Sequence, residues 1–229
     1  MERPAGHKRL HGRRKGHALK DRQQRLVETL LPQVALGLGE PAPDALSSVF
    51  ARNPEKIVLE IGFGGGEHLA AGADSNPDWG FIGAEAYLNG IAKMLVEIDD
   101  RSLSNVRLHM GDANDLLAWL PDASLDRADL LYLDPWPKRR HWKRRFISDE
   151  SLTQLARVLK PGSHLRFASD WPDYLTWTLM YLLKRHDFRW LAETADDWRR
   201  SWAGWTRTRY EAKALREGRM PAYLTFERV

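Results

Sequence analysis

The pattern of apolar and polar positions changes near residue 57. From there on, short β-branched or apolar runs alternate with stretches in which apolar residues recur every three or four positions. The short runs predict seven strands, at 57–61, 80–84, 106–110, 128–133, 164–168, 188–193 and 222–227. Strands and helices that alternate in this way predict an α/β fold, with a mostly parallel seven-stranded sheet and helices on both of its faces.

Two of the stretches between the strands have a clear helical face. One carries apolar residues at 88, 91, 95 and 98, and the other carries them at 152, 155 and 159. Ser148 is predicted to cap the second of these helices, and the run Lys160-Pro161-Gly162 to stop it. A further short helix is expected around residues 20–31.

The first fifty residues do not share this alternation. Gly and Pro crowd at 36–43 (LGLGEPAP), which is typical of a linker. The length of 229 residues and a hydrophobic content of 43% suffice for one sizeable core. We therefore expect a basic, in part disordered arm and linker at 1–50 and one domain at 51–229.

Charge is concentrated in two places. Residues 1–25 hold nine Lys or Arg and two acids, residues 138–145 hold six and none, and the remainder carries twenty cations and twenty-nine acids. Two basic patches on an otherwise acidic chain indicate an anionic partner that is met at defined places, and nucleic acid is the leading candidate. For the amino-terminal patch, a solvated disordered tail is an equally good interpretation.

Several classes are disfavoured by what the chain lacks. It has no cysteine, which removes disulfides and thiolate metal sites, and its eight histidines show no HExxH spacing, so no metal site is expected. No run approaches the roughly 20 apolar residues of a membrane span, and the N-terminus is charged without an apolar core behind it. No membrane partner and a cytoplasmic location are the default expectations.

The first predicted strand ends in LEIGFGGGEH, which contains Glu60, Gly62, Gly64 and Gly66. Glycines at these positions let the backbone turn tightly and approach a ligand. The third glycine of the dinucleotide fingerprint is replaced by Glu67, and an acid precedes the turn. The spacing E-x-G-x-G-x-G therefore fits S-adenosylmethionine, which carries an amino group and a sulfonium, better than NAD. A strand-to-helix turn that binds nothing is the alternative.

The next two strands also end in acids. Glu85 follows the second strand, where a carboxylate can accept hydrogen bonds from ribose hydroxyls, and Asp112 follows the third, where it could accept from an adenine amine. Either acid alone could instead be a helix cap or a turn residue. Together with Glu60 they outline a nucleoside-shaped pocket.

The fourth strand, expected at the centre of the sheet, leads into YLDPWPKRRHWKRRF at 132–146. Asp134 would lie beside the methyl donor, and Pro135 and Pro137 stiffen the turn and restrict Trp136, which suits a stacking platform for a base. The basic run that follows is predicted to contact phosphates. A rigid structural loop and a solvated charged face remain the alternatives.

These segments, with ASDW and TRYE further along, closely resemble the bacterial tRNA (guanine-N7-)-methyltransferase family from about residue 57 to the C-terminus. The motif DPWPK followed by RH and KRR is the most specific part. A looser similarity covers RRKGHALKDRQQRL, where the family also begins with a basic arm. The resemblance implies a Rossmann-like class I methyltransferase, monomeric or homodimeric, that uses S-adenosylmethionine to methylate N7 of a guanine in the variable loop of tRNA.

The resemblance also assigns residues to roles. Asp134 would be catalytic and would line the cofactor site with Glu60, Gly62, Gly64, Gly66, Glu85 and Asp112. The target nucleotide would be held by Lys138, Asp170, Thr208, Arg209, Tyr210 and Glu211. The RNA backbone would be met by Arg140, His141, Trp142, Lys143, Arg144 and Arg145. Tyr210 stands where the family often has phenylalanine, a change that preserves stacking.

Four other classes stay open at this point. An RNA-binding protein on a degenerate methyltransferase scaffold would lose the pocket acids, all of which are present here. A small-molecule methyltransferase would have no use for the run at 138–145, and the glycine spacing disfavours a nicotinamide oxidoreductase. An amino-group methyltransferase acting on nucleic acid is the nearest enzymatic rival, because D-P-W-P loosely resembles its D-P-P-Y motif.

Overall fold

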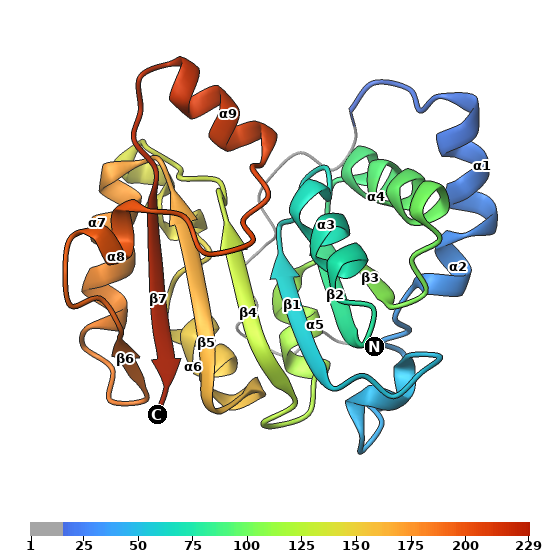
Figure 1. Cartoon of the computed structure of the whole chain (residues 1–229), viewed down its shortest axis with the longest axis horizontal. Helices are drawn as coiled ribbons and strands as arrows, with labels where there is room; N and C mark the ends of the chain where they lie inside the picture. The colour runs from blue at the N-terminus through green and yellow to red at the C-terminus, as the bar shows by residue number, and fades with distance from the viewer. Residues whose placement is uncertain (1–15) are drawn as a thin grey trace.

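In the computed structural model, which describes residues 16–229, seven strands form one sheet in the order β3-β2-β1-β4-β5-β7-β6 (Figure 1). Neighbouring strands are parallel except at β7, which runs antiparallel to β5 and β6. The predicted mostly parallel seven-stranded sheet is confirmed. The strands are β1 Lys56–Ile61, β2 Trp79–Glu85, β3 Val106–Met110, β4 Leu125–Leu131, β5 Leu159–Ser169, β6 Phe188–Trp190 and β7 Ala222–Arg228.

Helices cover both faces of this sheet. One buried cluster joins strand side chains to α5, α6 and α7, and a second joins β1–β3 to α1–α4. The helices are α1 Asp21–Thr29, α2 Leu31–Val34, α3 Glu67–Ser75, α4 Leu88–Arg101, α5 Ala113–Trp119, α6 Asp149–Val158, α7 Pro172–Leu182, α8 Asp196–Arg199 and α9 Arg209–Arg216, with 3-10 turns η1 Leu46–Val49 and η2 Arg139–Arg144. The core thus consists of two apolar layers with the sheet between them.

Three strands differ from the prediction by more than one residue at an end. β4 ends at Leu131, two residues early, because Tyr132 has a φ of 53°, which an extended strand does not permit. β5 begins at Leu159, five residues early, since that residue pairs with Leu125 of β4. β6 ends at Trp190, three residues early.

The ends of α6 follow from its sequence. The Ser148 hydroxyl accepts from the backbone N–H of Ser151 at 3.3 Å, which confirms the predicted cap. The helix ends at Val158, before the Lys-Pro-Gly run that was predicted to stop it. The short helix expected around 20–31 is also present, as α1.

The described part of the amino-terminal arm packs on the domain. Arg22 of α1 pairs with Asp99 and Asp100 of α4 at 2.6 and 2.5 Å. In the segment at 36–43, the Leu36 N–H donates to the Leu108 carbonyl at 2.8 Å. Residues 1–15 of the basic arm lie outside the described residues, and the boundary near residue 50 stays a prediction.

The order of the strands places β1 and β4 side by side at the centre, with Glu60 in register with Asp129. The chain crosses to opposite halves of the sheet after these two strands, and such a switch point is where open α/β sheets bind ligands. The turns that follow β1, β2 and β4 therefore meet at one edge, the upper edge in Figure 1.

Candidate active site

The turn after β1 depends on its glycines. Gly62, Gly64 and Gly66 have φ values of 70°, 60° and 82°, a region that side chains other than glycine rarely adopt. The turn is also pressed against α4, because a Cβ on Gly90 would lie 2.3 Å from the carbonyl oxygen of Gly64. The predicted glycines are thus required by the conformation of the turn, and Gly90 is required by the close approach of the turn to α4.

Glu85 ties the end of β2 to this turn. Its Oε2 accepts from the Gly64 N–H at 2.8 Å, and its Oε1 accepts from the N–H groups of Ala86 and Tyr87 at 2.8 and 2.9 Å. Burial raises the pKa of Glu85, and the charge of Asp134 adds to this, while the three backbone hydrogen bonds oppose it. Glu85 is therefore a half-buried acid held in place by backbone donors.

Glu60 lies deeper than its neighbours at the site. It is 3% exposed, and its Oε2 lies 2.8 Å from Nδ1 of His68 on α3. Burial lowers the pKa of His68, but the charge and hydrogen bond of Glu60 outweigh that effect and the pKa is raised overall. One carboxylate oxygen of Glu60 is thus engaged by α3, and its contact with a cofactor stays a prediction.

Asp112 caps a helix. Its Oδ1 accepts from the backbone N–H and the side-chain amide of Asn114, both at 2.9 Å, at the start of α5. This is the cap that the sequence left open as an alternative. A role toward an adenine amine stays a prediction for this residue.

Asp134 follows β4 in a loop with unusual backbone geometry. Tyr132 and Trp136, on either side of it, have φ values of 53° and 42°. Such values cost on the order of 1–3 kcal/mol for a bulky residue and persist only where the surroundings impose them. Asp134 as a residue is exposed to solvent, yet partial burial of its carboxyl raises its pKa. A carboxyl with that pKa is suited to respond to a nearby positive charge.

The basic run after the loop divides into an inner and an outer group, and the structure corrects the prediction for Arg145. Its guanidinium is 2% exposed, lies 5.0 to 5.1 Å from the rings of Trp142, Tyr174 and Trp177, and donates to the Pro135 carbonyl at 2.8 Å. Trp142 belongs to the same cluster, edge-on to Trp177. Arg145 and Trp142 therefore hold the loop from inside, and the buried Arg145 has little surface to offer to RNA.

The outer group faces solvent. Lys138, Arg140 and Lys143 are exposed on η2 and the turn before it. Arg144 stacks over the Trp136 ring at 5.0 Å, and His141 meets the same ring edge-on at 5.8 Å. Trp136 is thus in contact with two side chains of the basic run, and its role as a stacking platform for a base stays a prediction.

The TRYE segment begins α9 and sits over the glycine turn. A Cβ on Gly64 would lie 3.1 Å from Cε2 of Tyr210. Burial raises the pKa of the Tyr210 phenol, the charge of Arg209 opposes this, and the charges of Glu85 and Asp134 add to it. The structure therefore brings the predicted nucleotide-binding tyrosine onto the predicted cofactor turn, within range of the charge of Asp134.

The Glu211 side chain is buried, unlike that of Tyr210. It is 3% exposed, and its oxygens accept from the Trp205 indole at 2.6 Å and from the Tyr223 hydroxyl at 2.7 Å. Thr208 caps α9 by accepting from the Glu211 N–H at 3.2 Å. In this arrangement Glu211 fastens α9 to β7 through Tyr223, and Thr208 caps the helix. Sequence reasoning missed Trp205 and Tyr223 as partners, because neither lies at a helical or strand spacing from Glu211.

Asp170, at the end of β5, pairs with Arg219, whose Nε donates to Oδ2 at 2.5 Å. Sequence reasoning did not single out Arg219, since nothing in its local pattern marks it. The predicted nucleotide-binding aspartate is therefore engaged in an ion pair near the site.

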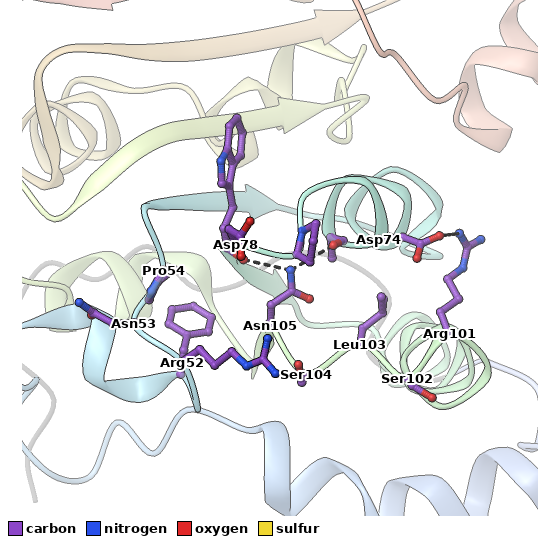
Figure 2. A pocket seen from close by; sticks show the side chains of 14 residues that line it. Arg52, Asn53, Pro54, Asp74, Asp78, Arg101, Ser102, Leu103, Ser104 and Asn105 are labelled. Carbon is purple, nitrogen blue, oxygen red and sulfur yellow. Dashed lines mark hydrogen bonds and ion pairs between the residues drawn. The ribbon is translucent and has the colours of Figure 1, made fainter.

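A hollow of about 220 Å³ lies at the opposite edge of the sheet, before the starts of β1, β2 and β3 (Figure 2). Arg52 and Asn105 point toward it in the figure, and the Asn105 amide donates to three backbone carbonyls, those of Ala73, Asn76 and Trp79. Because the strand ends that carry the candidate residues face away from it, this hollow is separate from the candidate site.

Over residues 16–229, we find no group of three or more His, Cys, Asp and Glu that could hold a metal ion. No helix in the same range has the length and apolar character to cross a membrane.

Comparison with known proteins identifies the family. A family model described as "Putative methyltransferase" matches residues 54–223. A tRNA (guanine-N(7)-)-methyltransferase from Rhodopseudomonas palustris (strain BisB5) is 55% identical over 218 residues, which cover 95% of this chain and 85% of that protein. The chain belongs to the tRNA (guanine-N(7)-)-methyltransferase family. A member of this family from Chelativorans sp. (strain BNC1) is 52% identical over 218 residues, covering 95% of this chain and 94% of its own.

Solved structures match the fold of this tRNA (guanine-N(7)-)-methyltransferase family member. An rRNA methylase from Streptococcus thermophilus has a TM-score of 0.51 at 14% identity and covers 80% of this chain and 92% of its own. A 16S rRNA (adenine(1408)-N(1))-methyltransferase from Catenulisporales acidiphilia, solved with its cosubstrate SAM, has a TM-score of 0.51 at 19% identity and covers 77% and 87%. The predicted Rossmann-like class I methyltransferase fold is confirmed.

Proposed function

We propose that this methyltransferase transfers a methyl group from S-adenosylmethionine to N7 of a guanine in the variable loop of tRNA. The observation that carries the proposal is the convergence of Asp134, Glu85 and Tyr210 over the glycine turn, in a chain that belongs to the tRNA (guanine-N(7)-)-methyltransferase family. tRNA is then the partner, and the cytoplasm is the location that we propose for it.

The residues at the site fit the cofactor. The left-handed glycines let the backbone turn tightly at the site, and two of the nearby ionisable groups, Glu85 and Asp134, are acids. Acids suit a ligand that carries an ammonium and a sulfonium, and when bound that ligand supplies an electrophilic methyl group. Gly62, Gly64 and Glu85 would hold it, with Asp134 at its reactive end.

The acceptor explains why the site has few catalytic groups. N7 of guanine carries an in-plane lone pair and no proton, so no general base is required. The residues need to hold N7 in line with the methyl group, and such positioning is worth up to roughly 7–11 kcal/mol in well-oriented systems. The purine becomes cationic on methylation, and the Asp134 carboxylate, ionised, would stabilise that charge in a site partly shielded from water.

The remaining residues would position the RNA. Tyr210 is 48% exposed above the glycine turn, so its ring can stack on a guanine that has left its helical stack. Lys138, Arg140 and Lys143 form an exposed basic surface beside the Asp134 loop, where phosphates would bind.

The decisive experiment is incubation of the purified protein with labelled S-adenosylmethionine and unmodified tRNA transcripts, followed by nucleoside mass spectrometry. We expect 7-methylguanosine, mapped by nuclease fragments to one site in the variable loop. Asp134→Ala should abolish turnover and leave tRNA affinity largely intact. A methylated exocyclic amine would instead support the amino-group methyltransferase, and cofactor binding without any methylated nucleoside would overturn the acceptor.

A further inference from the structure

His68, the second residue of α3, contacts two separate parts of the candidate site. Its Nδ1 lies 2.8 Å from Oε2 of Glu60, the buried acid that precedes the glycine turn. Its ring centroid lies 4.8 Å from that of Trp205, with 40° between the ring planes. The His68 side chain is 12% exposed, so both contacts are made largely away from water. One imidazole thus joins the end of β1 to the segment that precedes α9.

Trp205 is also held by α9 and β7. Its indole N–H donates to Glu211 of α9 at 2.6 Å. Its ring meets the rings of Trp202 and Tyr223 edge-on, with centroids 5.4 and 5.6 Å away. Edge-on aromatic contacts have a preferred geometry, so such a cluster fixes the orientation of its members. Because Glu211 follows Tyr210 directly in α9, the position of Trp205 influences where the Tyr210 ring lies.

The segment between α8 and α9 crosses the sheet to reach His68. Figure 1 shows this segment passing over β5 and β4 toward β1 and α3. α3 belongs to the half of the sheet that holds the glycine turn, whereas Trp205 and α9 belong to the half that ends the chain. The contact between His68 and Trp205 therefore spans the switch point between β1 and β4.

A second contact joins the same turn of α3 to α9. Nε of Arg209 lies 3.5 Å from Oε1 of Glu67, in side chains that are 37% and 36% exposed. Exposed ion pairs contribute little, because water screens them and two long side chains must be ordered. His68 is shielded; burial lowers its pKa, but the charge and hydrogen bond of Glu60 raise it overall, which favours a cationic ring that an indole attracts. We therefore expect His68 to hold the α9 segment more firmly than Glu67 does.

We propose that His68 is a positioning residue for both substrates. Its Nδ1 orients Glu60 at the cofactor turn. Its ring supports Trp205 and, through Trp205, the start of α9, where Tyr210 would meet the target nucleotide. The proposal rests on the proposed tRNA methyltransferase function. It gives one side chain two separable tasks, because the hydrogen bond uses a ring nitrogen and the support of Trp205 uses the ring itself.

The test uses two substitutions in the full-length protein, each of which keeps one of these tasks. His68→Asn places an amide nitrogen close to the position of Nδ1, so it retains a donor for Glu60 and loses the ring. His68→Phe retains a ring beside Trp205 and leaves Glu60 without its donor. A merely structural role would make the two variants differ only in degree, whereas the proposal predicts opposite patterns.

Cofactor affinity and the kinetics with tRNA are measured separately. In His68→Phe, the Kd for S-adenosylmethionine, measured by calorimetry, should rise at least about fivefold, because a hydrogen bond to a charged group is lost. Its kcat at saturating cofactor should stay within about twofold of wild type. In His68→Asn, that Kd should stay within about twofold of wild type, while kcat/KM for tRNA at saturating cofactor should fall at least about fivefold.

Hydrogen exchange reports on α9 without any reaction. The backbone amides of α9 should exchange faster in His68→Asn than in wild type, and at close to the wild-type rate in His68→Phe. Glu67→Gln, which removes the exposed ion pair, should speed this exchange less than His68→Asn does. His164→Asn is the matched control, because His164 is a half-buried histidine in the middle of β5, and it should change none of these measurements.

Two results would overturn the proposal. One is a parallel loss of cofactor affinity and tRNA kinetics in both His68 variants, in proportion to their unfolding temperatures; the other is wild-type behaviour in both. Failure of the proposed function looks different, since the wild-type protein would then bind S-adenosylmethionine and methylate no tRNA. In that case calorimetry and hydrogen exchange would still decide the two tasks of His68.

Discussion

Tyr132 and Trp136 both hold a left-handed backbone, with φ values of 53° and 42°, and Asp134 lies midway between them in the chain. The loop thus places two strained aromatic residues around one acid whose pKa burial raises. Such a strained backbone persists only where the surrounding structure imposes it. It costs stability and is typical of functional sites.

Asp134→Asn should separate activity from stability. Turnover should fall at least about 100-fold, as on loss of a preorganised electrostatic group. Because the folded-state pKa of Asp134 is raised, its ionised form costs stability above that pKa, and the cost disappears below the unfolded value. We therefore expect the variant to melt above wild type at pH 8, with a difference that shrinks on acidification.

The same carboxyl should shape the pH profile of wild-type kcat/KM for tRNA. The rate should decline as pH falls through the raised pKa of Asp134, since the protonated form cannot stabilise a cation. The acid limb should lie above the usual range of an aspartate and should be absent from the residual activity of Asp134→Asn. An acid limb retained in the variant would assign it to another group.

Arg145 and Arg140 should behave in opposite ways, although both lie in the basic run. Arg145→Ala removes a buried guanidinium from three aromatic rings and should destabilise the fold by about 2 kcal/mol or more, measured by urea unfolding. Arg140→Ala removes an exposed cation and should leave the unfolding midpoint unchanged. It should make the salt dependence of tRNA binding shallower by about 0.7–0.9 for each phosphate that Arg140 neutralises in the wild-type complex. The reverse pattern would place Arg145 at the RNA.

Glu211→Gln should loosen the cover over the glycine turn. A glutamine amide replaces one of the two charged oxygens that accept from Trp205 and Tyr223 with an NH2 group, so two hydrogen bonds to a carboxylate are lost or weakened at a cost of about 1–3 kcal/mol. We expect a lower unfolding temperature and a lower kcat/KM. Glu217→Gln, on the exposed end of α9, is the matched control and should change neither by a comparable amount. Full stability in Glu211→Gln together with a loss of activity would point to a direct contact with the nucleotide instead.

The His68–Glu60 pair should contribute stability that depends on pH. Because the folded-state pKa of His68 is raised, its contribution is fully present below the unfolded value of about 6.5 and is lost as pH rises through the folded pKa. His68→Gln should therefore lower the free energy of unfolding by about 1.5–3 kcal/mol at pH 5.5. The loss should be smaller at pH 8.5. A loss that grew with pH would contradict the charged pair.

Much of the fold could be predicted because local signals agree with it. The alternation of strand and helix, the glycine spacing and the Ser148 cap each reflect a requirement of the local backbone. The strand ends were less predictable. Tyr132 ends β4 through a left-handed conformation for which an aromatic side chain gives no signal, so the strand was expected to run two residues further.

The acids of the candidate site could be predicted from the sequence. Their hydrogen-bond and ion-pair partners were harder to predict. Residue type and position after a strand indicated Glu85 and Asp134; Glu85 ends β2, Asp134 follows β4, and the charge of Asp134 acts on Glu85. Burial of one cation among several was not visible in sequence. Arg145 and Arg144 are adjacent and chemically identical, and only the packing of α7 against the loop sends Arg145 inward.

Because β7 lies between β5 and β6 in the sheet, β6 cannot join the sheet in the order in which the strands are synthesised. β6 hydrogen-bonds within the described sheet to β7, which is made some thirty residues later, and α9 reaches the glycine turn only when the segment before β7 has emerged. On the ribosome, the half of the sheet built from β1–β5 can assemble first, while the strand at its edge waits for the last residues of the chain. A nascent chain therefore gains the Tyr210 side chain over the glycine turn only near the end of synthesis.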